Sequence, residues 1–481
     1  MADVELKSTH FALNEKLRRQ AYRAELSNPL ILPPLIPPLA WAGNTAHLVG
    51  DIVVNGGNQY LCQVAGTSAA SGGPSGLATR VIDNTVYWEF YGVSQIATAS
   101  PLAPTVAQTT TFPADLNAGL ATAGGGAYTV ADNGAGGTRS KLRLYGSTWI
   151  GAVQSGAAFV PIAYNNGVSA DLPYGRMEVV TDAAKIAIGF GNAGGYFRLL
   201  VDGQYINQSN YKSLTSGVNY VVIDFSSVGG KKWRRIAIEL GIAGPITVNT
   251  NIIGVYVSKL DTVMAPQTGN DITAVYCGDS IDAGFGPGPC IAGNKLASRI
   301  GHKLGINDMW SMSRPGTGDI NKAAGSAFYN YAERTPQIAA VNPQIVFTQT
   351  STNDAASSSA QRQAAILATM QSQRAAMPNA LLVRVGCWPV ASVTEAATIE
   401  ADALAAFNVF AAGDPNCMFI PLANDPDGPL LTGTGNNLSV ANNGNQDFYI
   451  SADGLHPIEF GTELIADRIV RAMRQRILPT I

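Results

Sequence analysis

The spacing of apolar residues changes character near residue 266. Before this point, over residues 100–265, strand-length apolar runs are separated by Gly, Asn and Asp, which is typical of antiparallel strands joined by turns. In one run Ile236 and Ile238 alternate with the polar Glu239, as a half-buried strand requires. The segment therefore predicts a β-sandwich, and its expected type is a jelly roll.

After residue 266, short unbroken apolar runs alternate with helical stretches. Alternation of this kind predicts a parallel sheet with helices on both faces, and candidate sites beyond the carboxyl ends of its strands. The predicted strands lie at residues 272–277, 308–313, 344–350, 380–387 and 417–422. The predicted helices lie at residues 291–304, 357–376, 393–412 and 459–476.

Two smaller units precede the sandwich. Residues 1–40 predict a helix followed by a proline-rich extended linker, which can serve as an anchoring or assembly element or form a frayed terminus. Residues 41–95 contain two β runs around an Asn-Gly-Gly-Asn turn, a strong hairpin signal. The predicted organisation is thus four parts: 1–40, 41–95, 100–265 and 266–481.

Composition narrows the function classes. A formal net charge of -3 supplies no basic footprint, so we expect no nucleic-acid partner. The N-terminus has no signal-peptide pattern and its apolar stretch is broken by prolines, so we expect synthesis in the cytoplasm and no membrane insertion. Five scattered cysteines lack metal-ligand spacing, which favours buried free thiols and no metal: Cys62, Cys277, Cys290, Cys387 and Cys417.

Four short stretches follow predicted strands or precede the last helix. They are GDS at 278–280, SRPGTGD at 313–319, TSTND at 350–354 and DGLHP at 453–457. In this order and at these places they resemble the SGNH hydrolases, also called GDSL esterases, over residues 271–477. The resemblance implies a flavodoxin-like α/β/α domain and ester hydrolysis without a cofactor.

The chemistry of a serine nucleophile also singles out two partners. Ser280 needs a base to take its proton, and of the four histidines only His456 lies in a strand-to-helix loop at the edge of the sheet. Asp453, three residues earlier, can accept the Nδ1 proton and orient the ring. The others, His10, His47 and His302, lie in the terminal segment, the small module and a helix.

The resemblance also implies an oxyanion hole. Its donors would be the backbone N–H groups of Ser280 and Gly318 and the side-chain amide of Asn353. Gly316 is a rival for the second donor. The chain departs from the family pattern at Ser351, where the family often has Gly, and at Ser313, which replaces an asparagine.

Aromatic residues are candidates for substrate contacts. Residues 41–95 resemble small β modules, related to chitin-binding domains, that recur in bacterial chitinases and phage tail proteins. Trp41, Tyr60 and Trp88 can stack on sugar rings there or simply form the core. Trp388, after a predicted strand, can line the substrate pocket or pack at its rim.

The resemblance suggests a serine esterase that removes O-acetyl groups from a bacterial surface polysaccharide, a capsule or O-antigen. We expect a phage tail-fibre or tailspike-like virion protein, joined to other tail proteins through its N-terminus and homo-oligomeric, with a trimer as one option. The alternatives are a broad-specificity bacterial esterase or lipase on small acyl esters, and a non-enzymatic glycan-binding tail adhesin.

Overall fold

The structure is a computed structural model of the chain. It describes residues 39–47, 52–56, 58–75, 81–93, 104–116, 143–145, 148–152, 158–162, 175–191, 196–202, 204–206, 212–213, 219–241, 251–258, 260–264, 266, 272–283, 295–322, 330–426 and 428–477. Of the helix and linker predicted for residues 1–40, residues 1–38 lie outside these ranges, as does Cys290, while Leu39 and Ala40 form a strand of the following module rather than the end of a linker. Among the described helices, none is long and apolar enough to cross a membrane.

The C-terminal part is built on a five-stranded parallel sheet in the order β22-β21-β23-β24-β25. Its strands are β21 (Thr273–Cys277), β22 (Asp308–Ser311), β23 (Ile345–Thr350), β24 (Leu381–Cys387) and β25 (Cys417–Ile420). This order is the flavodoxin-like one, and each strand lies within a predicted apolar run. The predicted α/β architecture of this region is therefore confirmed.

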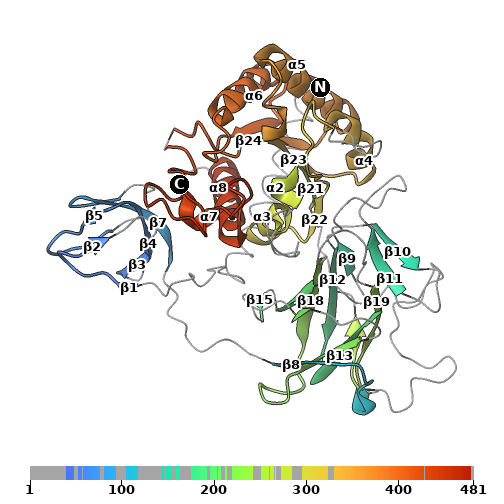
Figure 1. Cartoon of the computed structure of the whole chain (residues 1–481). Helices are drawn as coiled ribbons and strands as arrows, with labels where there is room; N and C mark the ends of the chain where they lie inside the picture. Colours follow the sequence, from blue (N-terminus) through green and yellow to red (C-terminus); the bar gives the residue numbers. More distant parts are fainter. Residues whose placement is uncertain are drawn as a thin grey trace.

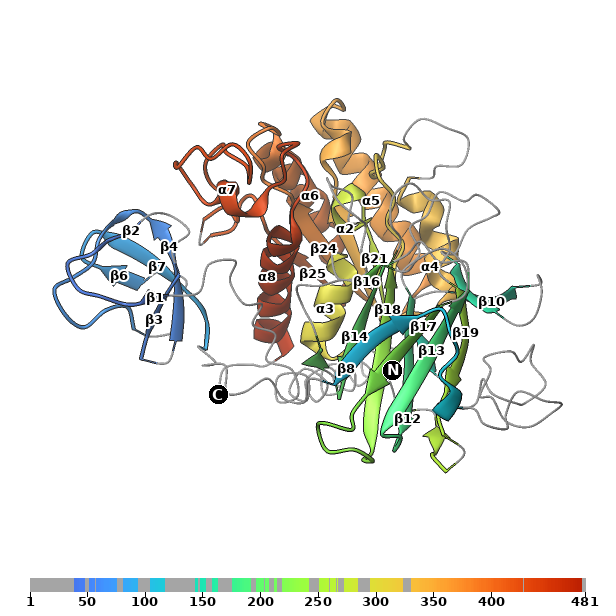
Figure 2. The same ribbon diagram turned by 60° about the horizontal axis from the view of Figure 1, so that its bottom comes forward.

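Helices cover both faces of this sheet (Figures 1 and 2). Ala274 and Tyr276 of β21 pack with helices α3 and α8, while Val275 and Cys277 of the same strand pack with α4, α5 and α6. Successive residues of a strand point to opposite faces, so an unbroken apolar strand fills both layers. The helices are α2 (Ser280–Ala283), α3 (Leu296–Leu304), α4 (Thr335–Ala340), α5 (Ser359–Ala376), α6 (Ala396–Ala411), α7 (Gln446–Tyr449) and α8 (Glu459–Ile477), with the 3-10 turns η4 (Ala332–Arg334) and η5 (Thr352–Asp354).

The described residues between 105 and 264 form two antiparallel sheets that face each other across one apolar core. The first has the order β10-β11-β19-β13-β17-β8, and the second has β15-β14-β18-β12-β20, with β16 and β9 paired at β14 and β12. The strands are β8 (Thr105–Thr109), β9 (Arg143–Tyr145), β10 (Thr148–Ala152), β11 (Ala158–Ile162), β12 (Gly175–Thr181), β13 (Lys185–Gly191), β14 (Tyr196–Val201), β15 (Gln204–Tyr205), β16 (Lys212–Ser213), β17 (Asn219–Asp224), β18 (Arg234–Gly241), β19 (Asn251–Tyr256) and β20 (Val263–Met264), and η1 (Ala114–Leu116) follows β8. The region is a β-sandwich, and the jelly-roll type stays a prediction.

One strand of the sandwich differs from its expected half-buried character. Ile236 and Ile238 of β18 enter the sandwich core, but Glu239 on the opposite face is also fully buried. Its carboxylate contacts His302 of α3 and lies 3.2 Å from Nη1 of Arg176. Glu239 faces the neighbouring α/β domain rather than water, because that domain covers the outer face of the strand.

The N-terminal module contains a five-stranded sheet in the order β1-β3-β4-β7-β6 and a small β2-β5 pair. The predicted hairpin is confirmed as β3 and β4. The strands are β1 (Leu39–Ala40), β2 (Ala46–His47), β3 (Ile52–Asn55), β4 (Asn58–Val64), β5 (Gly66–Thr67), β6 (Val81–Asp83) and β7 (Val86–Val93).

Two of the three aromatic residues suggested as sugar contacts lie inside this module. Tyr60 and Trp88 are 1% and 0% exposed and belong to the module's core. Trp41 packs against the same core, half-buried, and its indole N–H donates to Asp83 at 2.8 Å. The suggestion that Tyr60 and Trp88 stack on sugars is wrong, because so small a module needs them inside.

Candidate active site

Ser280 lies where strand β21 gives way to a helix. The strand ends at Cys277, Gly278 and Asp279 form the turn, and Ser280 is the first residue of α2. A Cβ at Gly278 would lie 3.0 Å from side-chain atoms of Gln349, Ser313 and Tyr276, so a larger residue would have to push these neighbours aside by a few tenths of an ångström. The turn holds the serine at the carboxyl edge of the sheet, 8% exposed.

His456 connects this serine to Asp453. Its Nε2 lies 2.8 Å from Ser280 Oγ, and its Nδ1 lies 2.7 Å from Asp453 Oδ2. An imidazole that donates its Nδ1 proton to a carboxylate keeps a lone pair on Nε2, which can then accept the serine proton. The structure thus brings together the three predicted side chains, although 176 residues separate Ser280 from His456.

Asp453 is held ionised by its surroundings. Partial burial acts to raise its pKa, but the backbone N–H of His456, the hydroxyl of Ser451 and the N–H of Leu455 all donate to the carboxylate. Together with the imidazole they lower the pKa of Asp453 far below its ordinary value. A carboxylate that stays charged is what an orienting partner of histidine requires.

The predicted oxyanion donors differ in whether their N–H groups already have a hydrogen-bond acceptor. Among the described residues, the backbone N–H of Ser280 has no hydrogen-bond partner. The N–H of Gly318, however, donates to the carbonyl of Asn321 at 2.9 Å. The N–H of Gly316, at a φ of 74°, has no acceptor within the described part of the chain. The oxyanion role of Gly318 stays a prediction, and Gly316 remains its rival.

The amide of Asn353 is also engaged. Its Nδ2 lies 3.0 Å from the carbonyl oxygen of Thr317 and 3.0 Å from Ser351 Oγ. The oxyanion role of Asn353 likewise stays a prediction. To serve an oxyanion, this amide would have to exchange one of these two acceptors for the substrate.

Comparison with known sequences adds an independent observation. The sequence model of the GDSL-like lipase/acylhydrolase family matches residues 275–469, which include Ser280, Asp453 and His456. The chain carries a GDSL/SGNH hydrolase domain. No curated protein sequence matches the chain.

Three solved structures similar to this one each cover 70% or 71% of the chain. A family two carbohydrate esterase from Clostridium thermocellum, in complex with cellohexaose, is 13% identical over 70% of this chain and 99% of its own, with a TM-score of 0.48. The acetyl xylan esterase from the rumen bacterium Butyrivibrio proteoclasticus is 14% identical over 70% and 96%, with a TM-score of 0.49. A salicylyl-acyltransferase from a tetracycline biosynthetic pathway is 14% identical over 71% and 97%, with a TM-score of 0.48. Identities and TM-scores this low say nothing about the activity or substrate of this chain.

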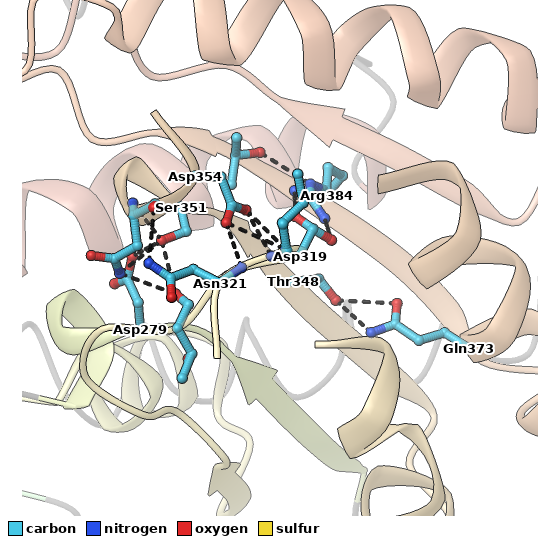
Figure 3. A network of polar contacts seen from close by, with 12 residues as sticks. Asp279, Asp319, Asn321, Thr348, Ser351, Asp354, Gln373 and Arg384 are labelled. Carbon is cyan, nitrogen blue, oxygen red and sulfur yellow. Dashed lines mark hydrogen bonds and ion pairs between the residues drawn. The ribbon is translucent and has the colours of Figure 1, made fainter. Parts of the chain in front are cut away.

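Ser351 ties three segments of the hydrolase domain together. Its Oγ lies 2.6 Å from the carboxylate of Asp279 and 2.9 Å from the carbonyl oxygen of Thr317, and it accepts the N–H of Asn353 (Figure 3). The family often has Gly at this position. Here the hydroxyl of Ser351 joins its own motif, TSTND, to Asp279 of GDS and to Thr317 of SRPGTGD. The departure therefore supplies a contact that glycine cannot make.

A second network beside it was not foreseen from the sequence. The carboxylate of Asp354 accepts the backbone N–H groups of Asp319 and Asn321 at 2.8 Å and of Ile320 at 3.3 Å (Figure 3). It packs so closely on Gly318 that a Cβ there would lie 2.4 Å from a carboxylate oxygen. Glycine is thus required at 318 for this contact. Asp354 is the last residue of the motif TSTND, and this position was the one feature of the sequence that could have pointed to its role.

Asp319 also forms a buried ion pair across the sheet edge. Its carboxylate receives both Nη groups of Arg384, at 3.1 and 2.5 Å, and Arg384 Nε donates to Thr350 (Figure 3). Burial, and then the charge of Asp319, raise the pKa of Asp354 to about 6. The loop that carries Gly318 is therefore fixed by two carboxylates, one of which titrates in the mildly acidic range.

Trp388 does not line a substrate pocket. Its side chain is 0% exposed and lies in the core shared with α3 and α8. Its indole N–H donates to the carbonyl of Leu455 at 2.9 Å, next to His456. The suggested substrate contact of Trp388 is wrong, because the indole packs under the histidine loop rather than facing solvent.

Two further expectations concern thiols and metals. Four of the five cysteines lie in the described ranges, and all four are free and buried: Cys62, Cys277, Cys387 and Cys417. Burial raises the pKa of the Cys277 thiol to about 11, which makes it inert. Within the described residues, no cluster of His, Cys, Asp and Glu has the makings of a metal site.

Proposed function

We propose that this protein is a serine esterase that removes O-acetyl groups from a polysaccharide. The observation that carries the proposal is the hydrogen-bonded chain Ser280–His456–Asp453 within a GDSL-like hydrolase domain. Serine becomes a nucleophile only beside a base, and a base acts well only when a third group fixes its tautomer.

The proposed reaction follows from the positions of the three side chains. Ser280 Oγ attacks the ester carbonyl carbon while His456 Nε2 takes its proton. The tetrahedral intermediate collapses to an acyl-enzyme as His456 returns the proton to the departing sugar oxygen. Water, deprotonated by His456, then attacks the acyl carbon, and acetate leaves as His456 returns this proton to Ser280 Oγ. Asp453 stays ionised throughout and stabilises the imidazolium.

The negative oxygen of each intermediate needs donors that already point toward it. The N–H of Ser280 is available at the first turn of α2, and the N–H of Gly316 is available in the neighbouring loop. Gly318 and Asn353 are the donors that the family resemblance implies. We assign the first oxyanion donor to the N–H of Ser280. Which of Gly316, Gly318 and Asn353 supply the other donors is a question for substitution.

The substrate part of the proposal rests on the appended β regions. A sandwich and a small module precede the hydrolase domain, and the module resembles those that recur in chitinases and phage tail proteins. We propose a bacterial capsule or O-antigen as the polysaccharide and a phage tail as the setting, with the N-terminal residues as the attachment to other tail proteins. The resemblance of these modules is an analogy of fold and supplies no argument about the chemistry of the active site.

The test is hydrolysis by the purified full chain. Acetylated xylan and p-nitrophenyl acetate serve as probes, with p-nitrophenyl octanoate as the long-chain competitor. We expect acetate release that falls at least about 10³-fold in Ser280→Ala and is unchanged in Ser439→Ala, which alters an exposed serine of the same domain. A preference for octanoate would indicate a lipase instead. Glycan binding without turnover, equal in Ser280→Ala, would indicate an adhesin.

A further inference from the structure

The segment that follows strand β24 holds the loop that carries His456. The indole N–H of Trp388 donates to the carbonyl of Leu455 at 2.9 Å, and the hydroxyl of Ser392 donates to the carbonyl of Gly454 at 2.7 Å. Both acceptors belong to the loop of residues 451–457, which we call the histidine loop. Two successive carbonyls of this loop are therefore bound from one neighbouring segment.

The histidine loop's own hydrogen bonds set its shape but not its place. The N–H of Ser451 donates to the carbonyl of His456 at 2.8 Å, and the N–H of Gly454 donates to the carbonyl of Ser451 at 2.9 Å. These bonds move with the loop as a unit. Contacts that join the loop to the sheet are the ones that fix the distance between His456 and Ser280.

Trp388 is itself held rigidly. It is fully buried in the core of the hydrolase domain, directly after the last residue of β24. The N–H of Cys387, the preceding residue, donates to the buried carboxylate of Glu400 at 2.8 Å. A donor on so fixed a base can hold the Leu455 carbonyl at a constant position relative to the sheet.

We propose that Trp388, assisted by Ser392, is a positioning residue for His456 in the reaction. The proposal rests on the proposed esterase function and extends it to residues that do not touch substrate. Catalysis is sensitive to such positioning, since a misplacement of about 1 Å can reduce the rate about 10²-fold. The Trp388 donor is fully buried and its bond to Leu455 is partly shielded from water, whereas the bond from Ser392 to Gly454 is exposed and is therefore the weaker of the two.

The main test is Trp388→Phe, which keeps an aromatic ring in the core and removes the N–H. The matched control is Trp310→Phe in β22, whose indole N–H donates to Asp308 at 2.8 Å, away from the histidine loop. We expect kcat on p-nitrophenyl acetate to fall about 10- to 100-fold in Trp388→Phe with KM within about twofold, and no change in Trp310→Phe. Equal kcat in Trp388→Phe and wild type overturns the proposal.

Ser392 provides a milder pair of variants. Ser392→Ala removes the donor and Ser392→Thr keeps it, so we expect a roughly two- to fivefold lower kcat in the first and recovery in the second, as for the loss of one weak hydrogen bond. A kcat equal to that of wild type in both Ser392 variants would overturn the assisting role of Ser392 and leave the positioning role to Trp388 alone. A kcat equal to that of wild type in Trp388→Phe as well would overturn the whole proposal.

A spectroscopic measurement separates this proposal from the esterase proposal. We expect the Nδ1 proton of His456, hydrogen-bonded to Asp453 at 2.7 Å, to give a strongly downfield proton resonance that is absent in His456→Ala. We expect it to broaden or shift in Trp388→Phe and to stay unchanged in Trp310→Phe. An inactive wild type with this pattern would contradict the esterase proposal alone, and an unshifted resonance in Trp388→Phe would contradict the positioning proposal alone.

Discussion

Two loops at the carboxyl edge of the sheet are each organised by one aspartate, and they differ in what that aspartate faces. Asp453 accepts the N–H groups of Leu455 and His456 within the histidine loop. Asp354 accepts three successive N–H groups of the loop at residues 319–321. In both loops one carboxylate accepts the backbone N–H groups of consecutive residues and so fixes the course of the loop.

The surroundings drive the two carboxyl groups in opposite directions. The side chain of Asp453 is 38% exposed and faces an imidazole, and its pKa is lowered. Asp354 is buried beside the charged Asp319, and its pKa is raised to about 6. Hydrogen bonds lower the pKa of both carboxyl groups, but at Asp354 burial and the charge of Asp319 outweigh them, whereas at Asp453 the hydrogen bonds outweigh the burial. The first arrangement suits proton transfer and the second suits holding a loop.

The strongest way to break this contrast is Asp453→Asn. The amide keeps an acceptor for the loop but loses the charge and favours the wrong imidazole tautomer. We expect kcat on p-nitrophenyl acetate to fall about 10³- to 10⁴-fold. Asp414→Asn, which removes a carboxylate that pairs with Arg374, is the control and should leave kcat unchanged. Retention of more than a tenth of wild-type kcat in Asp453→Asn would remove Asp453 from the proposed triad.

A smaller effect is expected at Asp354, whose raised pKa makes the stability of the protein depend on pH. The pKa of Asp354 is about 6 in the folded protein against an ordinary 3.8, so the folded state binds the proton more tightly. Its contribution to the free energy of unfolding is therefore largest below about pH 4 and declines until about pH 6, by roughly 2–3 kcal/mol in total.

Asp354→Asn removes this titration. Urea unfolding of wild type and variant at several pH values between about 3.5 and 7 measures the difference between their free energies of unfolding. We expect the stability of wild type relative to the variant to decrease as pH rises through this range and to level off above about pH 6. A difference that does not vary with pH would mean that Asp354 titrates in its ordinary range.

Regular elements and the triad were accessible from the sequence for a common reason. The strands of the α/β domain are apolar on both faces, and this pattern depends only on each strand's own residues. The triad followed from the scarcity of histidine and the place of His456 before the last helix. The pairing of Ser280 with His456 could be predicted because the topology of a parallel sheet and the order of four motifs that resemble the SGNH hydrolases both place the two residues at one sheet edge.

Contacts between parts of the chain were not accessible in this way. Glu239 has the alternation of a solvent-facing residue, yet another domain covers its face. Trp388 follows a strand as a pocket residue would, but the sequence does not reveal that Leu455 supplies an acceptor beside it. The partners of the Gly318 and Asn353 donors depend on the local course of two loops, which residue type alone does not determine.

The central claim is that His456 activates Ser280. A fluorophosphonate of small alkyl size, followed by mass spectrometry of the digested protein, measures this directly and needs no knowledge of the natural substrate. The account predicts a single adduct on Ser280, formed at least about 10²-fold more slowly in His456→Ala. Labelling at another serine, or equal rates in wild type and His456→Ala, would contradict it.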